Sequence, residues 1–192
     1  DMDFQSPPAV LEALQTRIAH GVFGYGGKQA ALAAVICARL AHVYQWTVTP
    51  EQILFLPGLV SGLNLVCRAI GQPGDEVLVQ TPVYPPFLTA PNHQERQLKT
   101  IPLTAQTTAA SRLHYEIDFQ AFAEAFSAKS ALFLLCHPHN PVGRLFSRAE
   151  LTQLAEHCLH NNTVICSDEI HCDLLLDGQQ HIPMATLGPE VA

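Results

Sequence analysis

Two apolar runs that end in polar residues constrain the fold of this 192-residue chain more than any other feature. Residues 131–136 lead into a His-Pro-His-Asn-Pro-Val-Gly stretch, and residues 163–166 lead into Ser-Asp-Glu-Ile-His. Near-continuous apolar runs are typical of parallel strands that helices cover on both faces. Ligands of such sheets bind beyond the carboxyl ends of the strands. The two runs therefore predict a helix-covered parallel sheet with a polar site at one edge.

The rest of the chain alternates between helical and strand patterns. Apolar residues recur at helical spacing in the segments 7–20, 28–44, 63–70, 118–126 and 148–160, with predicted N-caps at Ser6, Asp118 and Ser147. Strands are predicted at 53–56, 76–80, 98–103, 131–136 and 163–168. Residues 104–113 are predicted to be a polar surface connection, and the prolines between 82 and 86 to exclude a helix interior. This order indicates an α/β fold, a three-layer sandwich with a mainly parallel sheet, plus a short N-terminal segment.

Composition and charge narrow the class of protein. The chain is 48% hydrophobic and 14% charged, which suits a globular protein with one sizeable core. Its net charge of −7 disfavours a nucleic-acid groove or an anionic-membrane surface, because both need clustered Lys and Arg. No apolar segment approaches the about 20 residues of a membrane helix, and no signal peptide is recognisable. The six cysteines include no Cys-x-x-Cys pair and indicate reduced thiols, so we expect a soluble cytoplasmic protein.

Residues that could form a binding site follow several of the predicted strands. The turn at 57–62 joins a predicted strand to a predicted helix, an arrangement that points backbone N–H groups at an anion such as phosphate. Tyr84 lies on a proline-stiffened loop after the strand 76–80, and Asn140 and Asp168 follow the two apolar runs. Each feature also has a plainer interpretation, because Pro-Gly turns are common and a loop tyrosine usually packs against its neighbours.

Several chemistries are disfavoured by the spacing of the candidate residues. A metal site could use the residues Cys136, His137, His139, His171 and Cys172. Adjacent residues point apart, however, and the closely spaced Cys-x-x-Cys or His-x-x-x-His pairs of a zinc site do not occur. The Gly-x-Ser-x-Gly elbow of a serine hydrolase, the Gly-x-Gly-x-x-Gly turn of a dinucleotide site and a Walker loop are also absent.

The remaining features together match the needs of pyridoxal 5'-phosphate (PLP). Its phosphate needs backbone donors at a helix start, which residues 58–61 offer, and its ring needs a flat partner such as Tyr84. Its phenolic oxygen needs a donor such as Asn140. Its pyridinium nitrogen needs an anion such as Asp168 to keep it protonated, and the protonated ring is what makes PLP an electron sink.

Several motifs in the same order resemble those of a known family. Residues 138–143 (Pro-His-Asn-Pro-Val-Gly) and 167–171 (Ser-Asp-Glu-Ile-His) resemble paired signatures of fold-type-I PLP enzymes, the class I/II aminotransferase family. Residues 1–4, 21–25 and 81–84 are similar to motifs of its cystathionine β-lyase, or cysteine C–S lyase, branch. The resemblance extends over nearly the whole chain. It implies the PLP-transferase fold, here as an incomplete large domain.

The resemblance implies a role for each matched residue of the cofactor site. Asp168 would pair with the pyridinium nitrogen, and Asn140 would hydrogen-bond the phenolic oxygen and also approach the substrate carboxylate. Tyr84 would stack on the ring. The backbone amides of Leu59 and Val60 would hold the phosphate.

Further implications concern the subunit boundary and the domains. Tyr25 would reach the phosphate in the neighbouring subunit, so the site would be complete only in a homodimer. His171 stands where many aminotransferases have Tyr, and cofactor contact and packing behind the site are both open for it. Residues 1–26 would form an N-terminal segment and inter-subunit loop, and residues 27–192 the first portion of the PLP-binding large domain.

The resemblance also implies that a catalytic residue lies outside this chain. Lysine occurs only at Lys28, Lys99 and Lys129, whereas the Schiff-base lysine of these enzymes lies some tens of residues beyond the Asp-Glu-Ile-His motif. We therefore expect a fragment that ends at Ala192 before that lysine and is inactive alone. Later strands complete the family's sheet, so we expect the strand at 163–168 to have an exposed edge or face in this fragment.

The implied activity of the complete protein is carbon–sulfur β-elimination. It would act on cystathionine or related L-cysteine S-conjugates and give a thiol, pyruvate and ammonia. An aminotransferase on the same scaffold is the alternative reaction. A non-catalytic remnant or regulatory module of the same fold is the alternative of another class.

Overall fold

The computed structural model describes residues 4–27, 29–107 and 113–191. Residues 1–3 of the N-terminal motif, Lys28 and residues 108–112 of the predicted connection lie outside this part. The helices are α1 (Pro8–His20), α2 (Ala30–Tyr44), α3 (Leu59–Ala69), α4 (Pro86–His93), α5 (Phe119–Glu124) and α6 (Arg148–His160), with short 3₁₀ helices η1 (Pro50–Gln52) and η2 (Met184–Thr186). The strands are β1 (Glu76–Thr81), β2 (Gln97–Pro102), β3 (Thr104–Thr107), β4 (Leu113–Glu116), β5 (Ser130–Cys136) and β6 (Val164–Asp168).

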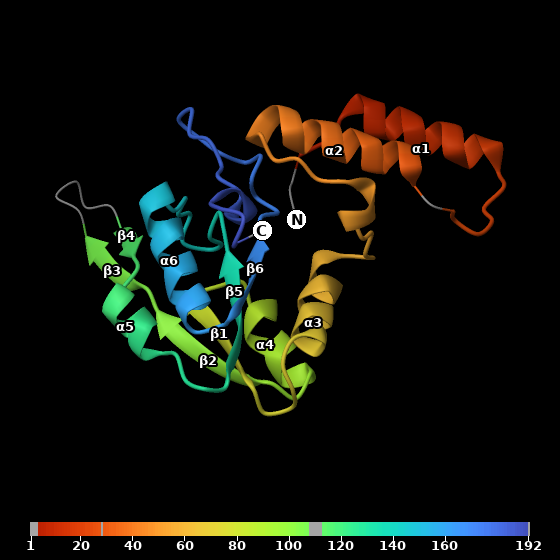
Figure 1. Ribbon diagram of the computed structural model, residues 1–192. Helices are drawn as coiled ribbons and strands as arrows, with labels where there is room; N and C mark the ends of the chain where they lie inside the picture. The colour runs from red at the N-terminus through yellow and green to blue at the C-terminus, as the bar shows by residue number, and fades with distance from the viewer. Residues whose placement is uncertain (1–3, 28, 108–112, 192) are drawn as a thin grey trace.

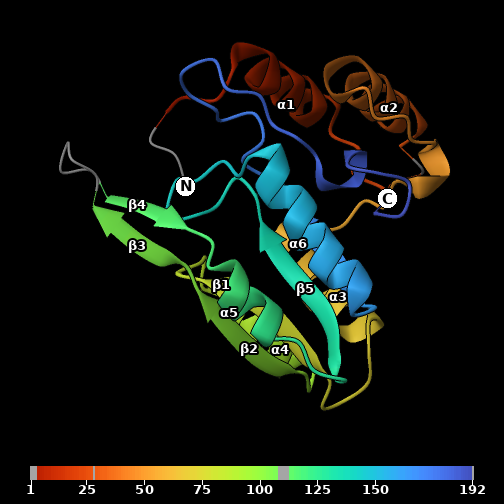
Figure 2. The same cartoon turned by 60° about the vertical axis from the view of Figure 1, so that its left-hand side comes forward.

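A four-stranded parallel sheet in the order β2-β1-β5-β6 organises the molecule. Helices α5 and α6 cover one face and α3 and α4 cover the other, as the two views in Figures 1 and 2 show. Parallel strands require crossover connections, and the alternating helices supply them. The predicted three-layer α/β fold is confirmed, and β2 is an edge strand as expected.

The core lies in two layers, one on each side of the sheet. Neighbouring residues of one strand enter different layers, because successive side chains point to opposite faces. Leu78 and Phe133 pack with α5 and α6, whereas Val79 and Leu134 pack with α3 and α4. All four are buried. The sheet is thus covered on both sides, which is why its central strands show no polar alternation in the sequence.

Local capping patterns set the starts of two helices as predicted. Asp118 accepts a hydrogen bond from the N–H of Ala121 at 2.9 Å, and Ser147 forms a capping box with Glu150. The predicted N-cap of α1 is wrong by one residue, since Pro7 occupies that position with an extended backbone. A residue that precedes proline is disfavoured in the helical region, so the helix begins only at Pro8.

Two segments differ from the prediction because of turn and helix-start geometry. Helix α4 was not predicted, but it begins only at Pro86, where the absent N–H of proline costs nothing, so the prolines between 82 and 86 stay outside a helix interior as predicted. Pro91 lies inside α4, and the helix ends two residues later at His93. The predicted polar connection 104–113 contains β3, which pairs with β4 in an antiparallel ladder.

The predicted buried strand at 53–56 is also wrong. No described residue pairs with this segment in a sheet, and Leu54 is 84% exposed. An apolar run becomes a strand only where another strand satisfies its backbone groups.

The parallel sheet ends at β6, whose pairing within the described residues is with β5 alone. The expected exposed edge at 163–168 is observed at β6.

Helices α1 and α2 lie beyond the end of the sheet at which β5 and β6 finish (Figures 1 and 2). Helix α1 contains no buried residue, and its apolar side chains Val10, Leu14 and Ile18 are exposed. Among the described residues, no helix combines the length and the hydropathy that a membrane crossing requires.

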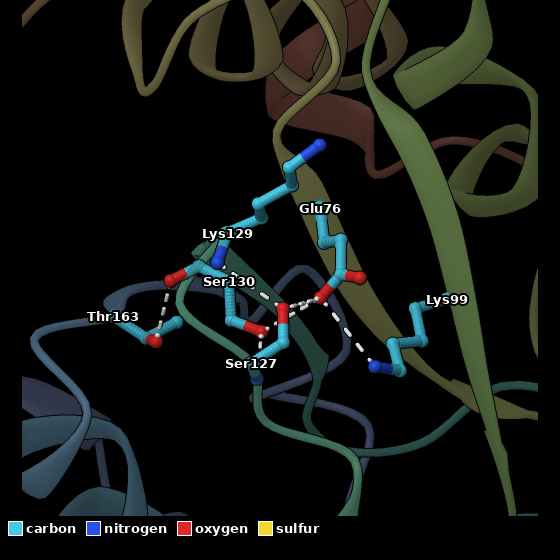
Figure 3. Close-up of polar contacts among 6 residues, drawn as sticks. All are labelled: Glu76, Lys99, Ser127, Lys129, Ser130 and Thr163. Atoms are coloured by element: carbon cyan, nitrogen blue, oxygen red, sulfur yellow. Dashed lines mark hydrogen bonds and ion pairs between the residues drawn. The ribbon is translucent and has the colours of Figure 1, made fainter.

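A polar cluster joins the strands at the amino edge of the sheet (Figure 3). Glu76 Oε2 accepts hydrogen bonds from the hydroxyls of Ser127 at 2.6 Å and Ser130 at 3.0 Å, and lies 3.4 Å from Lys99 Nζ. The hydroxyl of Thr163 donates to the carbonyl of Ser130 at 2.9 Å. The hydrogen bond from Ser127, together with Ser130 and Lys99, lowers the pKa of Glu76. We call these five residues the amino-edge cluster.

Candidate functional site

A cavity of about 520 Å³ lies at the carboxyl edge of the sheet. Its walls come from the start of α3, the loop after β1, and the ends of β5 and β6. The volume is in the range of small-molecule sites. The cavity brings together the predicted site residues Leu59, Val60, Tyr84, Asn140, Asp168 and His171.

The start of α3 supplies unpaired backbone donors to this cavity. Gly58 is the N-cap, and the first intrahelical bond is made by the N–H of Gly62 to the carbonyl of Gly58 at 3.1 Å. The N–H groups of Leu59 and Val60 precede that bond and have no acceptor within the helix. A Cβ at Gly58 would meet nothing within 4 Å, so a ligand can approach the backbone there. The helix start therefore suits a phosphate group.

Backbone hydrogen bonds hold Tyr84 and Asn140 next to each other. The N–H of Tyr84 donates to the carbonyl of Asn140 at 3.1 Å, and the N–H of Asn140 lies 3.4 Å from the Cys136 sulfur. The ring of His139 contacts the carbonyl of Pro82 at 2.9 Å. These contacts join the loop after β1 to the loop after β5. Tyr84 remains 41% exposed, so its ring is available to a ligand in the cavity.

Asp168 is the buried carboxylate of the cavity. It ends β6, is only 6% exposed, and accepts a hydrogen bond from the N–H of Ile170 at 3.1 Å. Burial raises the pKa of Asp168; the bond from Ile170 and the nearby His171 oppose this shift, and the charge of Glu169 adds to it. A buried carboxylate with so few donors gains stability from a cation or a protonated ring nitrogen. The site therefore offers an anion-binding end and a cation-binding end.

His171 and Tyr25 occupy different positions relative to the cavity. His171 lines it and also lines a neighbouring cavity of about 590 Å³ whose other walls include residues 138–141 and 174–177. Contact with a ligand and packing behind it therefore both stay open for His171. Tyr25 does not line the cavity, and its side chain is fully exposed on the loop after α1. Its predicted contact with a neighbouring subunit stays a prediction.

From the sequence, Cys136 and His137 are considered only as possible metal ligands, and the effect of burial on their pKa values is missed; Cys136 lines the cavity, and His137 follows it in the chain. His137 is fully buried, and burial together with the nearby His181 lowers its pKa to about 4. Burial raises the pKa of the Cys136 thiol to about 11. Among the described residues, no three His, Cys, Asp or Glu side chains form a group that could hold a metal ion. A signal for His137 existed in the sequence, since it immediately follows a strand residue, but its burial depends on distant segments.

The fold and the cavity define an α/β protein in which a free helix start, an aromatic ring and a buried carboxylate line one cavity at the carboxyl edge of a parallel sheet. The family model described as "Aminotransferase class I and II" matches residues 1–192. The chain therefore belongs to the class I and II aminotransferase family, which confirms the resemblance inferred from its motifs.

Known relatives include lyases and an aminotransferase. Cystathionine beta-lyase PatB of Bacillus subtilis (strain 168) is 41% identical over 193 residues, which cover 100% of this chain and 49% of that protein. The PLP-bound putative aminotransferase from Clostridium difficile 630 superposes with a TM-score of 0.91 at 32% identity, covering 100% of this chain and 48% of that one. The PLP-bound C-S lyase from Staphylococcus hominis has a TM-score of 0.90 at 32% identity, with coverages of 98% and 48%. The chain thus spans about half the length of the curated relatives it matches.

Proposed function

We propose that the complete protein containing this chain is a PLP-dependent carbon–sulfur β-lyase. Its substrates would be cystathionine or related L-cysteine S-conjugates, and its products a thiol, pyruvate and ammonia. The observation that carries the proposal is the convergence of a free helix start, an aromatic ring, an amide and a buried carboxylate in one cavity. The similarity to a cystathionine β-lyase and a C–S lyase supports the reaction type.

The residues of the cavity fit the parts of PLP one by one. The N–H groups of Leu59 and Val60 would bind the phosphate, and Tyr84 would pack on the ring. Asn140 would donate to the phenolic oxygen, and Asp168 would pair with the ring nitrogen. Bound PLP supplies an electron sink for the electrons released when the bond to the substrate α-hydrogen breaks.

Asp168 would act by holding a proton on the ring nitrogen. Its carboxylate is shielded from water, so a charge pair there is much stronger than at the surface. Burial alone raises the pKa of Asp168, and a cationic partner lowers it again. The carboxylate thus gains more from a protonated ring than a solvated carboxylate would. This difference favours the protonated form of the ring.

The acid–base lysine of the reaction would come from another part of the complete protein. Lys99 faces Glu76 in the amino-edge cluster, and Lys129 directly precedes β5 (Figure 3). Within the described residues no lysine lines the cavity. We accordingly propose that this chain supplies the cofactor-binding residues and no catalytic residue.

The assembly, domain division and compartment are proposals as well. Tyr25 would complete the site of a second subunit in a homodimer, which is supported by its full exposure and by the exposed apolar side chains of α1. The separation of residues 1–26 from residues 27–192 is supported by the lack of buried residues in α1. The free state of all six cysteines supports a reducing compartment such as the cytoplasm.

An aminotransferase is the second candidate, because a PLP-bound putative aminotransferase is as similar in structure as the lyase. The complete protein, loaded with PLP and given cystathionine alone, tests the choice. Pyruvate release without an added 2-oxo acid would support the lyase. Strict dependence on an added 2-oxo acid would support the aminotransferase instead. Lack of both reactions in a PLP-binding protein would support a non-catalytic remnant or regulatory module.

A further inference from the structure

One carboxylate closes the loop that follows β6. Glu169 Oε1 accepts hydrogen bonds from the hydroxyl of Ser167 at 2.8 Å and from the N–H of Met184 at 2.9 Å. Its Oε2 lies 2.8 Å from His181 Nε2. The side chain of Glu169 is 20% exposed and that of His181 is 1% exposed. Glu169 thus connects residues 181 and 184, at the far end of the segment 169–184, to the end of β6 next to Asp168.

The loop between these contacts has little packing of its own. None of the residues 170–180 is buried, whereas His181 and Met184 are. Its other long-range polar contacts are with α2: Asp173 forms an ion pair with Arg39, in which the two side chains are 62% and 50% exposed, and it accepts a hydrogen bond from the hydroxyl of Tyr44 at 3.5 Å. Exposed ion pairs contribute little to stability. The path of the loop, which carries His171 into the cavity wall, therefore depends mainly on its two ends.

The same contacts reach the loop that carries Asn140. The ring of His181 lies 4.8 Å from the ring of His137, which stacks on Phe146 at 5.7 Å. The N–H of His137 donates to the carbonyl of Asp168 at 2.9 Å. His137 lies three residues before Asn140. Through the ring of His137, the Glu169–His181 pair thus contacts the loop after β5 as well as the loop after β6.

We propose that Glu169 is a positioning residue for the PLP site. By fixing His181 and Met184 against the end of β6, it holds Asp168 and His171 in place at the cavity. The inference rests on the proposed function, because it concerns the geometry of the PLP-binding residues. Glu169 itself does not line the cavity.

The amino-edge cluster provides a matched control. Glu76 also accepts hydrogen bonds from two donors and faces a basic side chain, but it lies at the opposite edge of the sheet. In the complete protein, Glu169→Ala and Glu76→Ala are compared by PLP titration, by the induced circular dichroism of bound PLP and by thermal melting. We expect both to lower the melting temperature. Glu169→Ala alone is expected to weaken PLP binding roughly 10-fold and to reduce the dichroism at saturation.

Two conservative variants separate position from charge and remove fewer atoms than the alanine variant. Glu169→Gln keeps an oxygen at the right distance for the Met184 N–H, whereas Glu169→Asp keeps the charge on a shorter side chain. Positioning predicts that Gln restores PLP affinity better than Asp. A better rescue by Asp would overturn the inference, as would equal loss of PLP affinity in Glu169→Ala and Glu76→Ala. Failure of the wild-type protein to bind PLP would overturn the proposed function, and the inference with it, in the first titration.

Discussion

The two edges of the parallel sheet each carry a carboxylate, and the pKa values of the two carboxylates are shifted in opposite directions. Glu76 at the amino edge receives hydrogen bonds from Ser127 and Ser130, and its pKa is lowered. Asp168 at the carboxyl edge is buried with a hydrogen bond from Ile170, and its pKa is raised. A carboxylate of the first kind stabilises the fold when charged, whereas one of the second kind costs stability when charged. The carboxylate at the amino edge therefore favours folding when charged, whereas the one at the carboxyl edge would gain from a cationic partner.

The largest expected effect comes from replacing the carboxylate at the carboxyl edge. Asp168→Asn in the complete protein should weaken PLP binding by roughly 100-fold or more, because the ring nitrogen loses its buried counter-charge. The same variant should melt no lower than the wild-type apoprotein at neutral pH. Its raised pKa means that folding favours protonated Asp168, so its charged form is destabilising above that pKa. PLP titration and thermal melting of the apoprotein measure both quantities. Unchanged PLP affinity would remove the distinction between the edges.

A second prediction concerns a buried cation near the amino edge. The Arg96 guanidinium is 7% exposed and donates to four backbone carbonyls within 3.2 Å, those of Arg68, Ile70, Gly71 and Gln94. Arg96→Met leaves these oxygens, several of them at the end of α3, without that donor. We expect a loss of about 2 kcal/mol in the free energy of unfolding, measured by urea denaturation. PLP affinity should stay within experimental error of the wild-type value. A large change in it would contradict the assignment of stability to the amino edge and of PLP binding to the carboxyl edge.

The third prediction is a smaller loss of stability in the amino-edge cluster. Glu76→Gln should lower the free energy of unfolding by about 1 kcal/mol at neutral pH without changing PLP affinity. Because the pKa of Glu76 is lowered in the folded protein, its contribution is present above the ordinary pKa of Glu. It is lost as the pH falls through the lowered value. Urea denaturation at several pH values should therefore show the difference from wild type shrinking in acid. A constant difference would mean that charge is not its cause.

The smallest effect is expected at Tyr84. Tyr84→Phe keeps the flat ring and should change PLP affinity by less than roughly 3-fold, because stacking requires the ring alone. Tyr84→Leu is the matched variant and should weaken binding more, since it removes the ring while keeping an apolar side chain. PLP titration of both variants compares them directly. Equal affinities of the two variants would argue against stacking.

Predictions that depended on nearby residues in the sequence were mostly correct. The caps at Asp118 and Ser147 and the strands β5 and β6 follow from patterns only a few residues long. The segment 53–56 has an equally apolar pattern, and its predicted strand is wrong. A strand requires a partner elsewhere in the chain, and no local pattern contains that information.

The candidate site also combines features set by nearby residues with features that depend on distant segments. The sequence by itself determined which residue types follow each strand, and the parallel topology implied that Tyr84, Asn140 and Asp168 would meet at one edge. It also carried the motifs of the family. Only the tertiary structure decided that Glu169 would contact His181 and accept a hydrogen bond from the N–H of Met184. It also decided that the pKa of Asp168 would be raised and the pKa of Glu76 lowered. Burial and pairing set these properties, and both arise from segments that are distant in the sequence.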